Sequence, residues 1–82
     1  MMPRRMIPRH QTIDCQRLLC PMPVIRVQDC VATLEKGETV TAVCTDPGVL
    51  QDIPAWCRIN GHAVVSTETA DGEYLVTVRV GG

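Results

Sequence analysis

Two segments with helical periodicity alternate with segments in which every second residue is apolar. This order constrains the fold more than any other feature of the chain. The first helical segment carries an apolar stripe with spacings of three and four residues, made of Val24, Val27, Val31 and Leu34. The second carries a similar stripe, made of Val49, Leu50, Ile53, Trp56 and Cys57. Each stripe needs a partner surface, and the alternating segments supply one.

The ends of both helices are marked by local signals. We expect the first helix from about Pro21 to Lys36, ended by Gly37 in a left-handed conformation. Its polar positions, which are expected to face water, are Arg26, Asp29, Thr33 and Glu35. Asp46-Pro47 predicts the start of the second helix, since an N-cap residue precedes a proline at the first helical position. Pro54 predicts a kink or a break, and Asn60-Gly61 predicts the end.

Four segments are predicted as strands, at residues 11–15, 38–44, 63–67 and 74–80. Asp71-Gly72 predicts a hairpin turn between the last two. The strand–helix–strand unit of residues 11–44 predicts a parallel pair with a right-handed crossover. The fold class is therefore α/β of the α+β type. We expect a two-layer sandwich in the order β-α-β-α-β-β, with a mixed four-stranded sheet packed against two helices.

The chain of 82 residues has room for one domain, and its only aromatic residues are Trp56 and Tyr74. We therefore expect a core of Val, Ile, Leu, Ala, Met and Cys. The first ten residues carry three arginines and no acid, whereas the remainder carries five bases and nine acids. An acidic body does not favour nucleic-acid binding. This basic N-terminal segment is either a solvated terminus or a docking tail.

The five cysteines are Cys15, Cys20, Cys30, Cys44 and Cys57. The sequence shows no secretory leader and no membrane span, so we expect a cytoplasmic protein with free thiols. No Cys-x-x-Cys pair occurs, and neither histidine has ligand-like spacing to a cysteine. We therefore expect no metal and no cofactor.

Cys20-Pro21-Met22-Pro23 is the most informative tetrapeptide. With Pro21 as the first helical residue, Cys20 becomes the N-cap, where unpaired N–H groups and the helix dipole favour a thiolate. Pro23 has no N–H, so the Met22 N–H is the expected local donor. Arg26, on the next turn, either adds positive charge near the sulfur or is an ordinary surface arginine. The alternative for Cys20 is a small apolar residue packed under the loop.

The other cysteines favour structural roles. Cys30, Cys44 and Cys57 lie on or beside apolar positions and are expected to be buried thiols. Cys15 lies five residues before Cys20, and it is either structural or a resolving thiol for Cys20. In the second case the two cysteines would form a redox switch.

Several motifs in order resemble the TusA/SirA family of small sulfur-carrier proteins. The resemblance covers residues 12–82 and leaves residues 1–11 as a flexible extension. The residues that carry it are Asp14, Leu19, Cys20-Pro21-Met22-Pro23, Lys36-Gly37-Glu38, Thr45-Asp46-Pro47, Asp52-Ile53-Pro54, Trp56-Cys57 and Gly61-His62. The family pattern has glycine three residues before the cysteine, where this chain has Arg17. Arg17 is therefore expected either to influence the choice of partner or to raise the local positive potential.

The resemblance implies a function for the cysteine at the helix start. Cys20 would carry sulfur as a persulfide, received from a cysteine desulfurase or a rhodanese and passed to a cysteine of an acceptor protein. Members of the family serve tRNA thiolation, molybdenum-cofactor supply and sulfur oxidation. Asp46 and Asp52 match acidic positions of the family. Asp52 is a candidate for partner docking. Asp46 either caps a helix or also takes part in docking. We expect a monomer without direct contacts to nucleic acid or membrane.

A function of a different class is also compatible with the sequence. The helix tip around Cys20 would then bind a partner as a regulatory or interaction module, without moving sulfur. Such binding would survive replacement of Cys20 by serine, whereas sulfur transfer would not.

Overall fold

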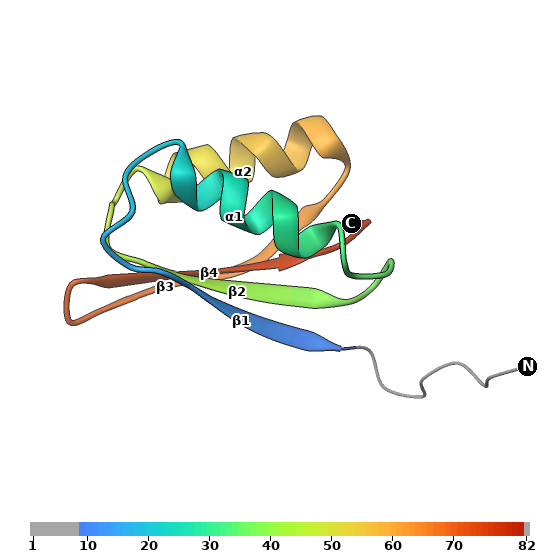
Figure 1. The fold of residues 1–82 in the computed structure, drawn as a ribbon, viewed down its shortest axis with the longest axis horizontal. Helices are drawn as coiled ribbons and strands as arrows, with labels where there is room; N and C mark the ends of the chain where they lie inside the picture. The colour runs from blue at the N-terminus through green and yellow to red at the C-terminus, as the bar shows by residue number, and fades with distance from the viewer. Residues whose placement is uncertain (1–8, 82) are drawn as a thin grey trace, which may run out of the picture.

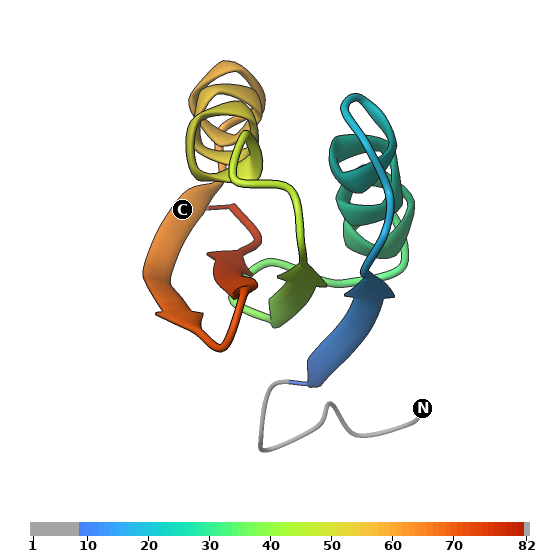
Figure 2. The ribbon, with the colours of Figure 1, turned by 90° about the vertical axis from the view of Figure 1, so that its left-hand side faces the viewer.

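The helices and strands follow one another in the predicted order. In the computed structural model, which describes residues 9–81, they are β1 (His10–Cys15), α1 (Met22–Val31), β2 (Thr39–Cys44), α2 (Val49–Asn60), β3 (Ala63–Ala70) and β4 (Glu73–Arg79). The strand order in the sheet is β1-β2-β4-β3. The pair β1/β2 is parallel and the other two pairs are antiparallel. Both helices cover the same face of the sheet (Figures 1 and 2), which confirms the predicted two-layer sandwich.

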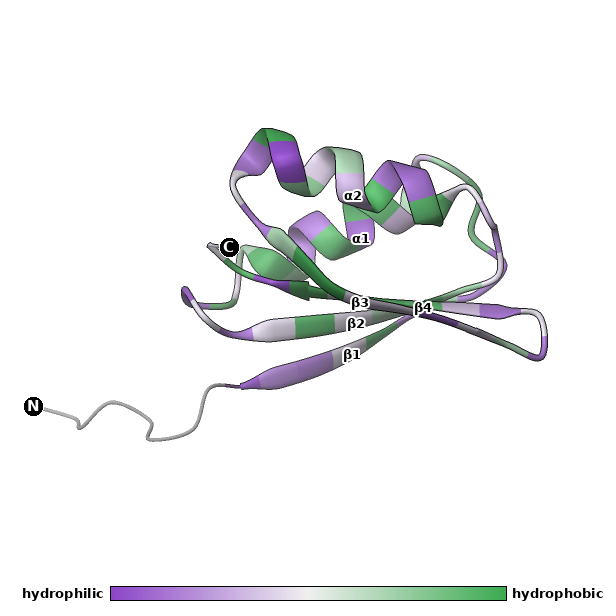
Figure 3. Cartoon of the chain, turned by 180° about the vertical axis from the view of Figure 1, so that it is seen from behind, coloured by the Kyte–Doolittle hydropathy of each residue, from purple (hydrophilic) through white to green (hydrophobic). Residues whose placement is uncertain are grey.

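The core lies between this face and the two helices. Val40, Ala42 and Cys44 of β2 are buried, as their alternation predicts. The fully buried side chains are mostly β-branched, the largest being Ile53, Val27, Val40, Val49, Val76 and Val78. Met22 is exposed, so within residues 9–81 methionine does not contribute to the core as expected. In Figure 3 the first half of β1 is purple (hydrophilic), whereas green (hydrophobic) residues recur along β2 and β4.

The first helix is shorter than predicted, because it ends at Val31 and not at Lys36. After Cys30 the chain tightens into short turns. The N–H of Thr33 donates to the Cys30 carbonyl, and the Thr33 hydroxyl donates to the same oxygen. A threonine hydroxyl that competes for backbone groups favours such a helix end. Gly37 has the expected positive φ of 92°, but it lies in the turn before β2 and does not cap the helix.

The second helix begins at Val49, two residues later than Asp46-Pro47 predicts. Asp46 still organises this start, since its Oδ1 accepts the Gly48 N–H at 3.0 Å in a side-chain turn. Pro54 lies inside α2, and the helix continues through it to Asn60, so the predicted break does not occur. Gly61 has φ 78° and ends the helix in the left-handed conformation, as predicted.

The final hairpin turns at Asp71 and Gly72, which both have positive φ. The expected alternation in β3 is wrong. A β-bulge between Val64 and Ser66 leaves Val65 without a partner in the ladder, and its side chain is exposed. Val64, and not Val65, packs against the core. One extra residue in a strand reverses which face the following side chains occupy.

The fold begins earlier than residue 12, where the sequence motifs place its boundary. His10 and Gln11 belong to β1 and pair with β2. Arg9 is tied to the buried Glu38, whose carboxylate accepts the Arg9 backbone N–H at 2.9 Å and its Nε at 3.3 Å. Arg4 and Arg5 of the basic start, and the rest of residues 1–8, lie outside the described residues.

Candidate functional site

The site lies at the carboxyl ends of β1 and β2. From these neighbouring parallel strands the chain enters two loops, residues 16–21 before α1 and residues 45–48 before α2. Figure 2 looks at this end of the molecule and shows both loops facing the viewer. The N–H of Arg17 donates to the Thr45 hydroxyl at 2.8 Å, which joins the two loops directly. Residues far apart in sequence therefore meet here.

Cys20 is exposed, but it is not the N-cap of α1. The helix begins at Met22, Pro21 occupies the N-cap position, and the Cys20–Pro21 peptide bond is cis. The Met22 N–H, which the sequence marks as a donor for the sulfur, instead donates to the Leu19 carbonyl at 2.8 Å. The sulfur therefore lacks the helix-tip donor that the sequence predicts for it.

Two carboxylates lie next to Cys20. The Asp46 Oδ2 accepts the Cys20 backbone N–H at 3.4 Å, while its other oxygen holds the Gly48 N–H. Asp52, in the first turn of α2, lies close enough to act on the pKa of the Cys20 thiol. A Cβ built on Gly48 would lie 3.4 Å from the Asp46 Oδ1 and 3.6 Å from the Asp52 Oδ2. The two carboxylates thus flank the small residue that separates them.

These carboxylates reverse the expected electrostatics of the site. The Asp52 carboxylate is the main group that raises the pKa of Cys20, and desolvation and the negative charge of Asp46 raise it further. A positive helix end would lower the pKa of a thiol, so the direction of this shift is opposite to the one that the sequence predicts.

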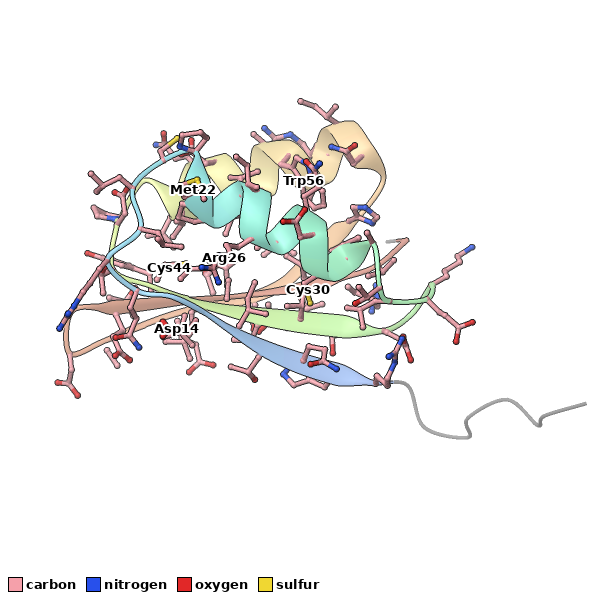
Figure 4. The ribbon with its side chains drawn as sticks, viewed as in Figure 1. Asp14, Met22, Arg26, Cys30, Cys44 and Trp56 are labelled. Carbon is pink, nitrogen blue, oxygen red and sulfur yellow. The ribbon has the colours of Figure 1, made fainter. Side chains whose placement is uncertain are left out.

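Arg26 does not offset this effect. Its side chain extends from α1 toward the sheet (Figure 4), and its charge acts on Cys15, where it lowers the pKa. It is not among the groups that shift the pKa of Cys20. Of the two sequence-based alternatives, that of a charge beside the Cys20 sulfur is therefore not supported.

The remaining cysteines are less accessible than Cys20. Cys15, Cys44 and Cys57 are buried, and Cys30 is half-buried against the core. Burial raises the pKa of Cys15, and burial together with the adjacent Cys15 raises the pKa of Cys44 to about 12. A buried thiol with a raised pKa does not favour a resolving role of Cys15 toward Cys20. The structure favours the structural alternative.

Three exposed apolar side chains lie close to Cys20 in the sequence. Leu19 precedes Cys20 and is 72% exposed, and Met22 and Ile25 on α1 are 42% and 40% exposed. Met22 lies at the first turn of α1 in Figure 4. Pro23, in contrast, is buried and fixes the helix start to the core. The exposed set, which we call the apolar collar (Leu19, Met22 and Ile25), is of the kind that protein partners cover.

The structure thus brings Cys20, Asp46, Asp52 and Met22 together at one end. Sequence reasoning identified each of them but missed that Asp52 acts on Cys20, from which it is separated by 32 positions in the chain. The signal available was indirect. Parallel strands that are neighbours in the sheet place their following loops side by side, and Cys20 and Asp52 follow such strands.

Comparisons with known proteins identify the family of the chain. A family model described as "Sulfurtransferase TusA" matches residues 11–80. The chain belongs to the TusA family. Two proteins of Neisseria meningitidis, from serogroups A and B, are each 32% identical to it over 69 residues, which is 84% of this chain and 93% of theirs. Both carry the name "putative sulfur carrier protein".

A solved structure shares the fold of this TusA-family chain. The crystal structure of a SirA-like protein from Desulfitobacterium hafniense superposes with a TM-score of 0.77 and 30% sequence identity. The match covers 88% of this chain and 99% of the other. Among residues 9–81, no group of three or more His, Cys, Asp or Glu side chains is arranged to hold a metal ion. Within the same residues, no helix is long and apolar enough to cross a membrane.

Proposed function

We propose that this TusA-family protein is a sulfur carrier that accepts sulfane sulfur as a persulfide on Cys20 and passes it to a cysteine of an acceptor protein. The observation that carries the proposal is the accessibility of Cys20. Of the five cysteines, all of which the structure describes, it is the exposed one. It also lies in the Cys-Pro-x-Pro segment on which the family resemblance rests.

The chemistry needs no cofactor. The sulfur of Cys20 attacks the terminal sulfur of a donor persulfide, the donor's S–S bond breaks, and the donor leaves as a thiol. A second exchange moves the sulfur to the acceptor. The donor is a protein such as a cysteine desulfurase or a rhodanese. The acceptor belongs to a route that the family serves, such as tRNA thiolation, molybdenum-cofactor supply or sulfur oxidation. A reducing cytoplasm would keep the thiol free for both exchanges.

The surroundings of Cys20 support exchange between proteins. The apolar collar offers a surface that a partner can cover, with the sulfur beside it. Asp46 and Asp52 add charge next to this surface and are proposed to assist docking, as is the exposed Arg17 on the preceding loop. Pro21, Met22 and Pro23 set the position of the sulfur relative to α1.

The proposal is tested by intact-protein mass spectrometry after incubation with a cysteine desulfurase and cysteine. Wild type should gain the mass of one sulfur atom, and dithiothreitol should reverse the gain. Cys20→Ser should gain nothing, whereas Cys30→Ser, a matched cysteine variant away from the site, should behave as wild type. Loading of Cys20→Ser to the wild-type level would exclude Cys20 as the carrier residue.

A partner pull-down distinguishes the carrier from an interaction module. If wild type accepts no sulfur from a desulfurase, a rhodanese or polysulfide, and Cys20→Ser retains its partners, the module is the better description. The apolar collar is the observation that favours this second function. Leu19→Ser should then weaken partner binding whether or not sulfur is transferred.

A further inference from the structure

Two buried cysteines are direct neighbours across the parallel pair of strands. Cys15 is the last residue of β1, Cys44 is the last residue of β2, and the two are partners in the ladder. Both are 0% exposed and belong to the core, so their side chains lie on the face of the sheet that the helices cover. In Figure 4, Cys44 and Asp14, which precedes Cys15, lie at the same end of the sheet. The loops of the candidate site begin directly after this pair of thiols.

The spacing of the two residues suits a disulfide. Neighbouring strands lie about 4.7–4.9 Å apart, and the Cα atoms of disulfide-bonded cysteines are about 4.4–6.8 Å apart. Contacts on both sides hold the pair in place. The ladder continues from it through Asp14 and Val43, and after it the N–H of Arg17 donates to the Thr45 hydroxyl at 2.8 Å. Bond formation therefore requires rotation of side chains and no rearrangement of the two strands.

The other cysteines are less well placed to pair with Cys15. Cys20 is exposed on the loop before α1, whereas Cys15 is buried under the helices. Cys30 and Cys57 belong to α1 and α2, in the opposite layer of the sandwich. The structure describes all five cysteines, and among them Cys15 and Cys44 form the one pair in direct register.

We propose that Cys15 and Cys44 form a redox-sensitive dithiol site, which a hydroperoxide oxidises to a disulfide between β1 and β2. This modification goes beyond the proposed function, because neither thiol is the proposed carrier of sulfur. A reducing compartment keeps such a pair as thiols, so the disulfide forms only under oxidising conditions. Once formed, it joins covalently the two strand ends from which the loops with Cys20 and Asp46 begin.

The oxidation balances with one hydroperoxide. The thiolate of one cysteine attacks a peroxide oxygen, the O–O bond breaks, and a sulfenic acid forms with release of water. The thiolate of the second cysteine then attacks this sulfur, an S–S bond forms, and a second water leaves. Two thiols and one hydrogen peroxide thus give one disulfide and two waters. Each sulfur loses one electron, and the peroxide gains two.

Burial makes this reaction depend on opening of β1. The thiolate is the reactive form of cysteine, and buried cysteines are inert in the closed protein. β1 is an edge strand, and its first three residues are exposed, so its opening leaves the other three strands paired. Oxidation of the pair should therefore be slower than that of the exposed Cys20, and urea below the unfolding transition should accelerate it.

The test is peptide mapping of the full-length protein after incubation with hydrogen peroxide. Free thiols are blocked with N-ethylmaleimide in urea, and the protein is digested with trypsin in the absence of a reductant. Cys15 then lies in the peptide of residues 10–17, Cys20 in residues 18–26, and Cys44 together with Cys57 in residues 37–58. The expected product is residues 10–17 linked to residues 37–58, and dithiothreitol should separate the two peptides.

Matched variants identify the two partners. Cys57→Ala should retain the linked product although it changes the same peptide, and Cys20→Ser should retain it as well. Cys15→Ala and Cys44→Ala should each abolish it. The map of the wild-type protein needs no variant, so it decides the question if either of these two does not fold.

Unfolding of the oxidised protein provides a second readout. The disulfide closes the long loop between residues 15 and 44, and this restricts the unfolded chain. The urea midpoint of the oxidised protein should rise by roughly 1 M or more, and dithiothreitol should remove the increase. Cys15→Ala treated in the same way should show no increase.

Two results would overturn the inference. The first is a link between residues 10–17 and residues 18–26, which would pair Cys15 with Cys20 instead of Cys44. The second is complete labelling of Cys15 and Cys44 by N-ethylmaleimide in a sample whose Cys20 has been oxidised. Sulfur loading of Cys20 is measured on the reduced protein, so neither result bears on the proposed function.

Discussion

The backbone N–H of Arg17 donates to the Thr45 hydroxyl at 2.8 Å, and this bond ties the loop that carries Cys20 to the loop that carries Asp46. Arg17 makes the contact with a φ of 64°, in the left-handed region that favours glycine. Glycine is the residue of the family pattern at this position. The loop therefore keeps a glycine-like backbone while presenting an arginine side chain.

Replacing Arg17 with glycine should stabilise the protein. A non-glycine residue in the left-handed region costs about 1–2 kcal/mol, and the greater freedom of glycine in the unfolded chain offsets about 0.5–1 kcal/mol of that. We expect a net gain of about 0.5–1 kcal/mol in urea unfolding. Arg17→Ala keeps the Cβ and removes the charge, so it should give no such gain. Equal gains in both variants would mean that the side chain, and not the backbone, destabilises the loop.

Glu38 should make the free energy of unfolding depend on pH in the acidic range. Its carboxylate accepts the N–H groups of Glu35 and Arg9 at 2.8 and 2.9 Å, and these bonds hold the pKa of Glu38 below its usual range. A carboxyl group whose pKa is lower in the folded state stabilises the fold at pH values above its pKa in the unfolded chain, which is about 4.3. This stabilisation is lost as the pH falls through the pKa of the folded state.

The urea midpoint of Glu38→Gln should accordingly lie below that of wild type at pH 7, and the difference should shrink toward pH 3. Glu35→Gln, which removes an exposed carboxylate of the same loop, is the control. A difference between wild type and Glu38→Gln that stays constant over this range would show that charge at Glu38 contributes nothing.

The buried thiols should react only after the protein opens. Burial keeps Cys15, Cys44 and Cys57 protonated and out of contact with solvent. With iodoacetamide at pH 8, Cys20 should be alkylated in the native protein, and the three buried cysteines at least about a thousandfold more slowly than in urea. Peptide mass spectrometry gives the rate at each site. Rapid native labelling of Cys15 would restore it as a candidate resolving thiol.

Two isoleucines of α2 test the position of the core. Ile53 is fully buried and Ile59 is 83% exposed, although both lie on the same helix. Ile53→Ala should lower the free energy of unfolding by about 2–5 kcal/mol, whereas Ile59→Ala should change it by less than about 0.5 kcal/mol. Chemical denaturation of the two variants measures both values. Similar losses would place Ile59 in a contact that this fold does not contain.

The sequence was sufficient to predict the order of the elements, because hydrophobic period is a property of each segment alone. The stripe through Val27 and Val31 and the alternation through Val76 and Val78 predicted which faces are buried. The sequence was not sufficient to predict features that depend on contacts with neighbouring segments. Thr33 shortens α1 by bonding back to the chain, and the bulge at Val65 reverses the facing of β3.

At the candidate site, too, features of a single segment were predicted and contacts between segments were not. Cys20 was identified from four consecutive residues, and the exposed position of its thiol agrees with that prediction. Its electrostatics were predicted from its own helix and were wrong in sign, because the charges that act on it come from α2 and the preceding loop. Spacing along the chain carries no information on such a contact until the parallel pairing of β1 with β2 is known.

The pairing of β1 with β2 also determines when the site is assembled during folding. Cys20 and Asp52 belong to successive strand–helix units, and only the docking of β1 beside β2 brings them within reach of each other. A chain emerging from the ribosome would display Cys20 before the second unit, which carries Asp52, has been made. For this protein, the surroundings of the cysteine are therefore complete only when the second strand–helix unit has folded.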